Sequence, residues 1–421
     1  MLSAIALIDA NNFYVSCERV FNAKLKDQPV VVLSNNDGCI ISRSNESKEL
    51  GIKMGEPFFK ARPLLAQHDV QIFSSNYELY GDMSARVMEI LQDFSSEVET
   101  YSIDEGFVGL QATNQEALTK IGQAIKAKIY RYTGVPVSVG MAENKTLAKV
   151  AAYHAKRSMK ANGVLNLTQS AYQQAALQRT PVDEIWGIGR QYANFLNAHK
   201  IQNAQELSRA KDDWIRQNLT VVGLRTVHEL RGISCFPLEL TPPAKQSITV
   251  SRSFGQDVES LDEVREAIAF FTARAGEKLR RQQLSAGSIT VFLQTNRFKS
   301  ENSYSNSVTF SLSPFTDSTL ELMELAQRGI AQIFRPGFRY KKAGLILKDL
   351  QETKKVTLRL LDQSRYEQMQ ELMKAVDHLN AKHGKDKIQF GAFKTKGKWR
   401  GLRGVRSPRF TTNWQEILTV A

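Results

Sequence analysis

The apolar and polar positions of the first 170 residues follow strand and helix periods in turn. An apolar run over residues 1–9 ends abruptly at Asp9, and residues 98–110 alternate on both sides of an adjacent acid pair, which predicts a hairpin. The other elements that the pattern predicts here are helices over 11–20, 77–94 and 112–132 and strands over 28–33 and 135–141. This succession predicts helices packed on one face of a mixed sheet.

The pattern changes twice further along the chain. From about residue 170, short helices are separated by glycines, and residues 181–200 fit a helix-hairpin-helix. The proline-containing stretch 237–245 predicts a linker. Beyond it, strands and helices follow the order β-α-β-β-α-β up to residue 350, which predicts a split βαβ domain.

Three acidic residues stand where predicted strands end or turn: Asp9, Asp104 and Glu105. Neighbouring side chains in a strand point to opposite faces, so the paired acids reach one point only if the backbone turns, and we expect Gly106 to permit that turn. Hard oxygen ligands in this number suit Mg²⁺, and two ions about 3.5–4 Å apart would serve phosphoryl transfer. For each acid taken singly, a strand-end cap or a solvated turn is the alternative.

The composition favours an anionic partner. The 421 residues are enough for several domains, and 56 Lys and Arg against 43 Asp and Glu give a net charge of +13. No apolar run approaches the ~18 residues of a membrane span, and the first strand lacks a charged leader, so we expect a cytoplasmic protein. Cys17, Cys39 and Cys235 are too few and too scattered for a disulfide framework or a zinc site.

Asp9–Glu18, followed far downstream by Tyr101–Glu105, resembles the Y-family of translesion DNA polymerases. Leu33–Cys39 and the tail beyond residue 350 are most similar to the branch found in bacterial DNA polymerase V. The resemblance implies an α+β right-hand polymerase with palm, small fingers, helical thumb and a β-α-β-β-α-β little finger. The boundaries that we expect are 1–33 and 79–169 for the palm, 34–78 for the fingers, 170–236 for the thumb, 237–246 for the linker, 247–350 for the little finger and 351–421 for a C-terminal partner-binding tail.

The resemblance also implies roles for individual residues. Asp9, Asp104 and Glu105, with the carbonyl of Ala10, would hold two Mg²⁺ ions. Tyr14 would be the steric gate that excludes a ribose 2′-hydroxyl, although from the residues alone a core aromatic is the alternative. The other nucleotide-binding candidates are Phe13, Cys39, Ile41, Asn45, Lys48 and Lys145.

Two of these candidates, Lys48 and Lys145, are cations. Asn45–Lys48 reads Asn-Glu-Ser-Lys where the family commonly has Tyr-Glu-Ala-Arg, so Lys48 offers a point charge without a bidentate fork. Lys145 begins a predicted helix, where its charge and the helix dipole both favour phosphate. Lys149 and Lys156 follow at helical spacing, but such lysines more often form a solvated face.

The DNA-binding candidates carry glycine or positive charge. Glycines of the helix-hairpin-helix expose backbone amides to a phosphate, and cations on a sheet contact phosphates without reading sequence. These candidates are Gly187, Gly189, Arg190, Arg252, Arg297, Lys299, Lys341 and Lys342. For any one of the cations a solvated surface is the alternative, and for the glycines an ordinary turn.

The tail is the most basic part of the chain. Residues 382–409 hold ten Lys and Arg against one acid, interleaved with Phe390, Phe393 and Trp399. Such a stretch fits either single-stranded nucleic acid or a docking tail that folds on a partner. The resemblance implies a processed UmuD-like accessory dimer and a RecA-like recombinase filament as partners, and a weakened sliding-clamp contact near Thr357–Leu361.

We therefore expect an error-prone, template-directed DNA polymerase that carries out translesion synthesis in the SOS response by two-metal nucleotidyl transfer. Its substrates would be primer-template DNA and deoxynucleoside triphosphates. One alternative is another two-metal nucleotidyl enzyme, such as a cyclase, which would not need a helix-hairpin-helix or a basic C-terminal half. The second is a non-catalytic DNA-binding subunit, which would not need all three acids, Tyr14 and Lys145 together.

Overall fold

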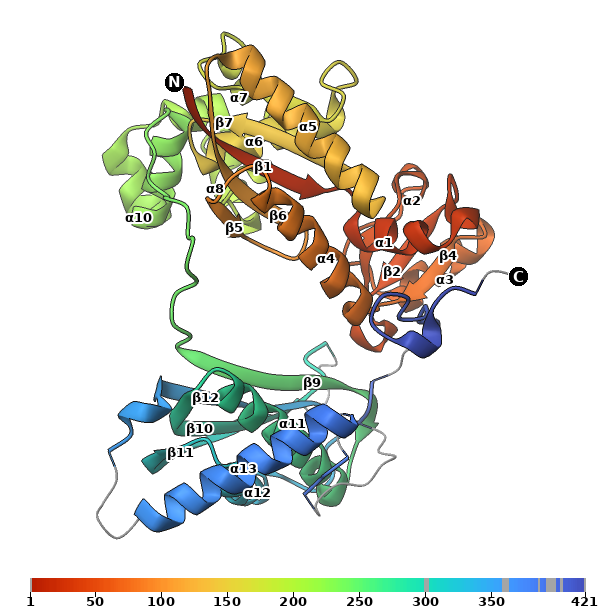
Figure 1. The fold of residues 1–421 in the computed structure, drawn as a ribbon, viewed down its shortest axis with the longest axis vertical. Coiled ribbons are helices and arrows are strands. Elements are labelled where there is room, and N and C mark those ends of the chain that lie inside the picture. The colour runs from red at the N-terminus through yellow and green to blue at the C-terminus, as the bar shows by residue number, and fades with distance from the viewer. Residues whose placement is uncertain are drawn as a thin grey trace. The chain divides into compact units, whose positions relative to one another are not determined.

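The computed structural model describes residues 2–298, 303–357, 363–384, 387–390, 399–401 and 404–419. The chain forms two compact units, Met1–Pro242 with Gly404–Ala421, and Pro243–Arg403. The C-terminal residues therefore return to the first unit, where Figure 1 draws them in dark blue. None of the described helices is both long and apolar enough to cross a bilayer.

A five-stranded mixed sheet forms the centre of the first unit (Figure 1). Its order is β5-β6-β1-β7-β8, and β1 runs antiparallel to both β6 and β7. The strands are β1 (Leu2–Ala10), β5 (Val98–Thr100), β6 (Glu105–Ala112), β7 (Val137–Ala142) and β8 (Val164–Asn166). The predicted hairpin is confirmed, because β5 and β6 pair antiparallel with Thr100 opposite Gly106.

Helices cover both faces of this sheet, so the expectation of a single covered face is wrong. On one face, Ile8 and Val108 share a core with α4 (Tyr77–Gln92) and α5 (Gln115–Thr133). On the other, Leu7 and Phe107 pack with α6 (Lys145–Arg157). The physical reason is that β1 and β6 carry apolar side chains on both sides, which requires cover on both.

A smaller sheet of order β3-β2-β4 follows β1 and α1 (Phe13–Phe21) in the chain. Its strands are β2 (Val30–Leu33), β3 (Ile40–Arg43) and β4 (Gln71–Ser74), and its helices are α2 (Asn45–Glu49) and α3 (Phe58–Gln67). Val31, Leu33 and Ile40 form its own small core. This sheet lies between β1 and α4 in sequence, as an insertion into the larger sheet.

Four helices complete the first unit: α7 (Gln173–Arg179), α8 (Arg190–Ala198), α9 (Ala204–Ser208) and α10 (Asp212–Leu230). Their apolar side chains share one core with α6, including Leu196, Leu207 and Leu230. This shared core fixes the helices to the face of the large sheet that carries α6.

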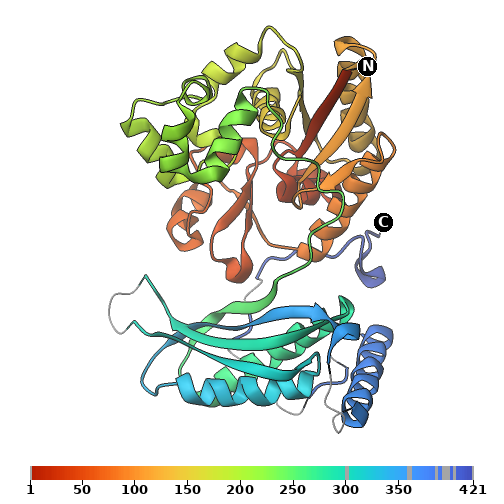
Figure 2. The same ribbon diagram turned by 90° about the vertical axis from the view of Figure 1, so that its left-hand side faces the viewer.

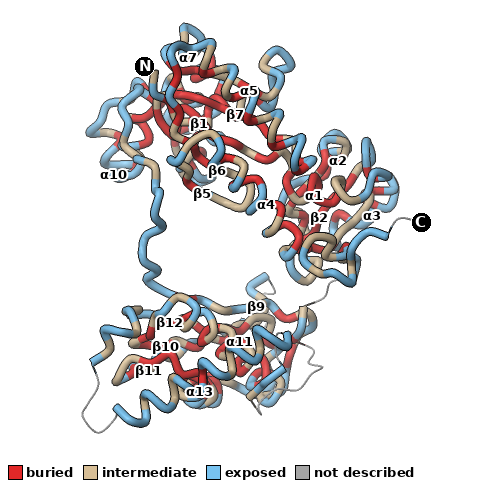
Figure 3. Tube along the Cα trace, in the orientation of Figure 1, coloured by how far each residue is buried: buried red, intermediate tan, exposed pale blue. Residues whose placement is uncertain are grey.

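The second unit contains the predicted β-α-β-β-α-β succession. Its strands are β9 (Ser247–Val258), β10 (Leu284–Thr295), β11 (Ser305–Thr316) and β12 (Tyr340–Glu352), in the order β11-β10-β12-β9. The helices α11 (Leu261–Arg281) and α12 (Thr319–Ile333) pack against the sheet around a core that includes Phe254 and Ile289. Figure 2 shows α12, in cyan, along the sheet, and Figure 3 shows the buried positions between these layers.

The residues after β12 add structure that the sequence pattern did not predict. A long helix, α13 (Gln363–His383), is held to α11 by a bidentate pair in which Arg280 donates to both oxygens of Asp377, at 2.6 and 2.8 Å. Trp399 is 1% exposed and packs against Phe270 and Phe271 in the core of this unit. Of the two alternatives for residues 382–409, stacking on nucleic-acid bases is therefore closed to Trp399, because its ring is buried.

Candidate active site

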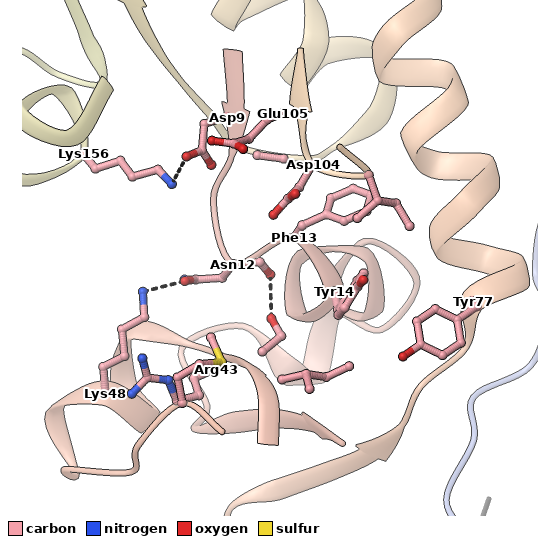
Figure 4. A pocket seen from close by; sticks show the side chains of 15 residues that line it. Asp9, Asn12, Phe13, Tyr14, Arg43, Lys48, Tyr77, Asp104, Glu105 and Lys156 are labelled. Carbon is pink, nitrogen blue, oxygen red and sulfur yellow. Dashed lines mark hydrogen bonds and ion pairs between the residues drawn. The ribbon is translucent and has the colours of Figure 1, made fainter. Parts of the chain in front are cut away.

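The end of β1 and the start of β6 meet at one point of the large sheet. Asp9 and Glu105 are directly opposite one another in the antiparallel register, and the Ala10 amide donates to the Asp104 carbonyl at 2.8 Å. All three acids line a cavity of about 590 Å³ between the sheet, α1 and β3 (Figure 4). The register thus brings residues 9 and 105 together although 95 residues separate them in the sequence.

The turn before β6 is built by Ser102. Its hydroxyl donates to Asp104 Oδ1 at 2.7 Å and accepts from the backbone amide of Glu105 at 3.0 Å. Gly106 lies within β6 and does not make the turn, so that expectation is wrong. A Cβ on Gly106 would meet Met88 Sδ at 2.9 Å, so the close approach of α4 favours glycine here.

Two lysines of α6 neutralise two of the acids. Lys156 Nζ lies 2.5 Å from Asp9 Oδ2, and Lys149 Nζ lies 2.7 Å from Glu105 Oε1. Burial nevertheless raises the pKa of Asp9 above its ordinary value, and the charges of Glu105 and Asp104 act in the same direction, while Lys156 opposes them. Burial thus disfavours the charged form of Asp9, and a cation bound beside it would stabilise that form.

Carboxylate oxygens are the kind of ligand that a hard cation prefers, but these carboxylates do not surround a metal position on all sides. Among the described residues, no group of three or more His, Cys, Asp or Glu side chains is positioned to hold a metal ion. In Figure 4 the Asp104 carboxylate points into the cavity, while Asp9 faces Lys156. An open set of carboxylates is the arrangement that Mg²⁺ shares with substrate phosphates.

An aromatic floor lies next to the acids. Tyr14, on α1, stacks on Tyr80 with ring centroids 4.6 Å apart and meets Tyr77 edge-on at 6.1 Å. Burial raises the pKa of Tyr14 to about 12, so its hydroxyl stays protonated at neutral pH. Phe13 and Ile41 line the same cavity, and Phe13 is buried.

A cationic rim faces this floor from the smaller sheet. Lys48 Nζ donates to Asn12 Oδ1 at 2.6 Å, and Arg43 also lines the cavity (Figure 4). Burial lowers the pKa of Lys48, and the nearby charges of Arg43 and Lys156 lower it further. Positive charges crowded in this way favour a polyanion between them.

Comparison with known proteins identifies the family. The model of the impB/mucB/samB family matches residues 8–153, the C-terminal domain of that family matches 245–360, and a domain of unknown function (DUF4113) matches 370–420. The chain is 42% identical to protein UmuC of Salmonella typhimurium over 419 residues, which is 99% of each chain. The chain belongs to the impB/mucB/samB family.

Further relatives of this family member extend the comparison. It is 39% identical to protein MucB of Escherichia coli, over 98% of each chain. It is 27% identical to DNA polymerase IV of Desulfatibacillum aliphaticivorans, over 69% of this chain and 74% of the relative. A solved Y-family DNA polymerase chimera of Dbh and Dpo4 superposes with a TM-score of 0.66 at 21% identity, over 82% of this chain and 98% of that one.

These relationships identify the fold as that of Y-family polymerases, as the sequence predicted. They support DNA-directed DNA polymerase activity and translesion synthesis in the SOS response, and they favour this reading over a cyclase or a non-catalytic subunit. The family as a whole implies DNA binding and a two-metal mechanism.

Not every predicted nucleotide-binding residue of this impB/mucB/samB family member lines the 590 Å³ cavity. Asn45 lines a neighbouring cavity of about 730 Å³, and Cys39 lines neither. Lys145 also lies outside both, since its side chain is 4% exposed and its Nζ lies 2.5 Å from Glu99 Oε2. A buried lysine with a carboxylate partner is held in the fold, away from the open cavity.

The sequence reasoning undervalued Lys156 and missed Asn12 and Arg43. Lys145, Lys149 and Lys156 lie on one face of α6, because residues four and seven apart recur at the helical period. Which lysine meets the acids depends on how α6 crosses the sheet, and the C-terminal end is the one that reaches Asp9. The spacing of the lysines was visible in the sequence, but the crossing was not.

The predicted DNA-binding residues are spread over both units. Gly187 and Gly189 are exposed before α8, and Gly189 is the residue that caps it, with Arg190 exposed at its first position. In the second unit, Arg297 is exposed after β10, Lys341 lies 3.5 Å from Asp257, and Lys342 lies over the Phe292 ring. Arg252 lies partly buried in β9, and Lys299 lies outside the described residues, as do residues 358–361 of the predicted clamp contact.

Proposed function

We propose that this family member joins deoxynucleotides to a primer with Asp9, Asp104 and Glu105 as the ligands of two Mg²⁺ ions, and with the Ala10 carbonyl as an additional ligand. The observation that carries the proposal is the register that sets Asp9 opposite Glu105 in the lining of one cavity. When bound, such ions lower the pKa of the primer 3′-hydroxyl and stabilise the charge of the leaving pyrophosphate.

The chain's own cations receive the triphosphate. Lys156 and Lys48 both line the cavity that holds the acids, so a triphosphate there lies between α6 and the smaller sheet. Arg43 adds a third cation on the same side. Lys156 takes this role instead of the predicted Lys145, because Lys145 is buried against Glu99.

Tyr14 and Phe13 receive the sugar. Tyr14 lines the cavity beside the acids, with its ring stacked on the buried Tyr80, and a 2′-hydroxyl would collide with the Tyr14 ring. Ile41 lines the same cavity, and in this proposal its side chain leaves room beside the replicating base pair for a damaged template base. Asn45 and Cys39 act, in this proposal, from the periphery of the site.

The two units divide the work of holding DNA. The large sheet is the palm, the β3-β2-β4 sheet the fingers, α7–α10 the thumb and the second unit the little finger. Amides before α8 contact phosphates through Gly187 and Gly189, as do Arg190 and the cations of the second unit, Arg252, Arg297, Lys299, Lys341 and Lys342. These contacts position DNA without reading its sequence.

The enzyme works in the cytoplasm with partners. A processed UmuD-like dimer and a RecA-like filament are the proposed partners, on the ground of the 42% identity to UmuC. A sliding clamp would bind weakly near Thr357–Leu361, where the expected Gln is missing.

Primer extension on an abasic template tests the proposal. Asp104→Ala should abolish extension in Mg²⁺ while leaving DNA binding and the melting temperature close to wild type, since the Asp104 side chain faces the cavity. Asp93→Ala is the matched control, because it removes an aspartate that does not line that cavity. Extension that survives Asp104→Ala would remove the assignment of the site.

A further inference from the structure

The C-terminal residues 404–419 form a strap against the first unit. Ser74, at the end of β4, exchanges two hydrogen bonds with Val405: the Ser74 amide donates to the Val405 carbonyl, and the Val405 amide donates to Ser74 Oγ, both at 3.1 Å. The Phe410 ring stacks on Phe21 at the end of α1, with centroids 4.8 Å apart and planes 13° apart. The strap therefore contacts both the smaller sheet and the helix that carries Tyr14.

A buried polar contact fixes the register of the strap. Asn76, which is fully buried, donates through Nδ2 to the Ser407 carbonyl at 3.0 Å and to Ser407 Oγ at 2.9 Å. Its Oδ1 accepts from the Leu79 amide and so caps α4. The same side chain thus ties the strap to the start of α4, and displacement of the strap would leave a buried amide unsatisfied.

Ser407 continues this contact towards the nucleotide site. Its hydroxyl donates to Glu18 Oε1 at 3.0 Å, and the Tyr80 hydroxyl donates to the same oxygen at 2.6 Å. Glu18 is 2% exposed, and burial raises its pKa while the two hydroxyl donors act in the opposite direction. The ring of Tyr80 is the one that stacks on Tyr14.

Helix geometry makes this relay direct. Tyr14, Glu18 and Phe21 lie four and seven residues apart on α1, so they share one face of the helix. Ser407 and Phe410 contact two of these residues, and Tyr80 contacts the first two. The strap thus holds α1 at its far end and, through Glu18, fixes the ring beneath Tyr14.

We propose that the C-terminal strap is a positioning element of the polymerase site, acting through Ser407, Glu18 and Tyr80 to fix Tyr14 against the incoming sugar. The inference rests on the proposed role of Tyr14 as the steric gate and adds what holds that gate in place. It gives residues 404–419, which belong to the match of unknown function, a part in substrate selection. A partner that lifts the strap would relax this selection.

The test uses the full-length chain and two substitutions in the relay. Ser407→Ala and Tyr80→Phe each remove one hydroxyl donor to Glu18 and leave the Tyr14 ring intact. Each should raise KM for deoxynucleotides more than it lowers kcat, and should reduce discrimination against ribonucleotides by about three- to tenfold, the scale of one ordinary hydrogen bond. Trp414→Ala, at an 89% exposed position of the same strap, should change neither.

The double variant separates a relay from two independent effects. If both hydroxyls act through Glu18, the combined loss of discrimination is smaller than the product of the single losses, whereas independent sites give the product. Unchanged discrimination in both single variants, an equal loss for both sugars, or multiplicative losses would overturn the inference.

Tyr14→Ala distinguishes this failure from failure of the proposed function. If Tyr14→Ala relaxes sugar selection and neither Ser407→Ala nor Tyr80→Phe does, the gate stands and the strap has no part in it. If Tyr14→Ala leaves selection unchanged, the gate assignment and the inference both fall.

Discussion

Lys156 Nζ lies 2.5 Å from Asp9 Oδ2, at the point where the last turn of α6 crosses the end of β1. The contact pairs a cation that lines the cavity with an acid whose pKa is raised by burial. Because Lys156 remains 31% exposed, its ammonium group can turn from the carboxylate to a phosphate without being buried alone. The pair therefore connects the proposed metal site to the proposed triphosphate site.

Lys156→Ala should raise KM for deoxynucleotides and lower kcat/KM by roughly tenfold to a hundredfold, because a direct ionic contact to the triphosphate is lost. The melting temperature should change little, since the side chain is partly exposed. Steady-state single-nucleotide insertion measures the effect, with Lys160→Ala, at an exposed lysine one turn beyond the helix, as control. If the KM of Lys156→Ala equals that of the control variant, Lys156 does not bind the triphosphate.

Asp9→Asn should abolish insertion yet increase the free energy of unfolding at pH 7. Burial raises the pKa of Asp9 in the folded protein above 3.8, so the native state binds this proton more tightly than the unfolded state. Stability from this group is complete below pH 3.8 and falls as the pH rises towards the raised value, beyond which the loss is constant. Asparagine avoids that loss, so its advantage should shrink as the pH is lowered to 3.8.

Urea unfolding of wild type and Asp9→Asn between pH 3.5 and pH 7 checks that sign. Asp69→Asn, at an exposed aspartate, controls for the general effect of removing one negative charge. An Asp9→Asn protein that is less stable than wild type at pH 7 would mean that the ion pair with Lys156 outweighs the cost of burial.

Tyr14→Ala should admit ribonucleotides by removing the ring that faces the sugar, with a change in discrimination of roughly tenfold to a hundredfold. Tyr14→Phe keeps the ring and its stacking on Tyr80, so it should retain sugar selection. Competition between ribonucleotides and deoxynucleotides in single insertions measures both. Equal selection by the Ala and Phe variants would show that the ring is not the gate.

Gly140→Ala should be far more damaging than Gly106→Ala, although both glycines lie in the strands around the site. A Cβ at Gly140 would lie 2.1 Å from the Ala152 amide nitrogen and 2.4 Å from the Ala148 carbonyl oxygen, both in the backbone of α6. At Gly106 the nearest atom is Met88 Sδ at 2.9 Å, and a methionine side chain can move. We expect a loss of about 1 kcal/mol at Gly106 and of about 3 kcal/mol or more at Gly140, measured by chemical denaturation.

The acids and the lysines show what the sequence could and could not predict. Asp9 and Glu105 could be brought together from the sequence because a strand end and a hairpin tip are local features, and the register then sets them opposite one another. Lys145 was favoured over Lys156 because a helix N-terminus is also a local feature. The choice between them depends on the crossing of α6 over the sheet, a long-range packing property.

The same distinction applies to Gly106 and Trp399. A glycine after an acid pair is typical of a turn, but its reason here is the approach of α4, which is remote in sequence. An aromatic among lysines is typical of nucleic-acid binding, yet Trp399 is buried against Phe270 and Phe271. The strap at residues 404–419 had no local signal at all, because its partners lie more than 300 residues away.

Lys145 gives the last prediction. Its side chain and that of Glu99 are 4% and 7% exposed, and Glu99 also accepts a hydrogen bond from the Glu239 amide at 2.7 Å. Lys145→Met should destabilise the protein by roughly 3–5 kcal/mol, because it leaves a buried carboxylate without its cation. The double variant Lys145→Met, Glu99→Gln should regain most of that loss, since Gln remains an acceptor for the amide without a charge.

Urea unfolding measures the cost, and single insertions measure KM per folded molecule. Because Lys145 lies outside the cavity, KM for deoxynucleotides should stay within about twofold of wild type in the double variant. A large rise in KM with an unchanged free energy of unfolding would show that Lys145 binds the triphosphate. The two measurements therefore separate a lysine that supports the fold from one that binds the substrate. Loss of the first lowers the free energy of unfolding, whereas loss of the second raises KM.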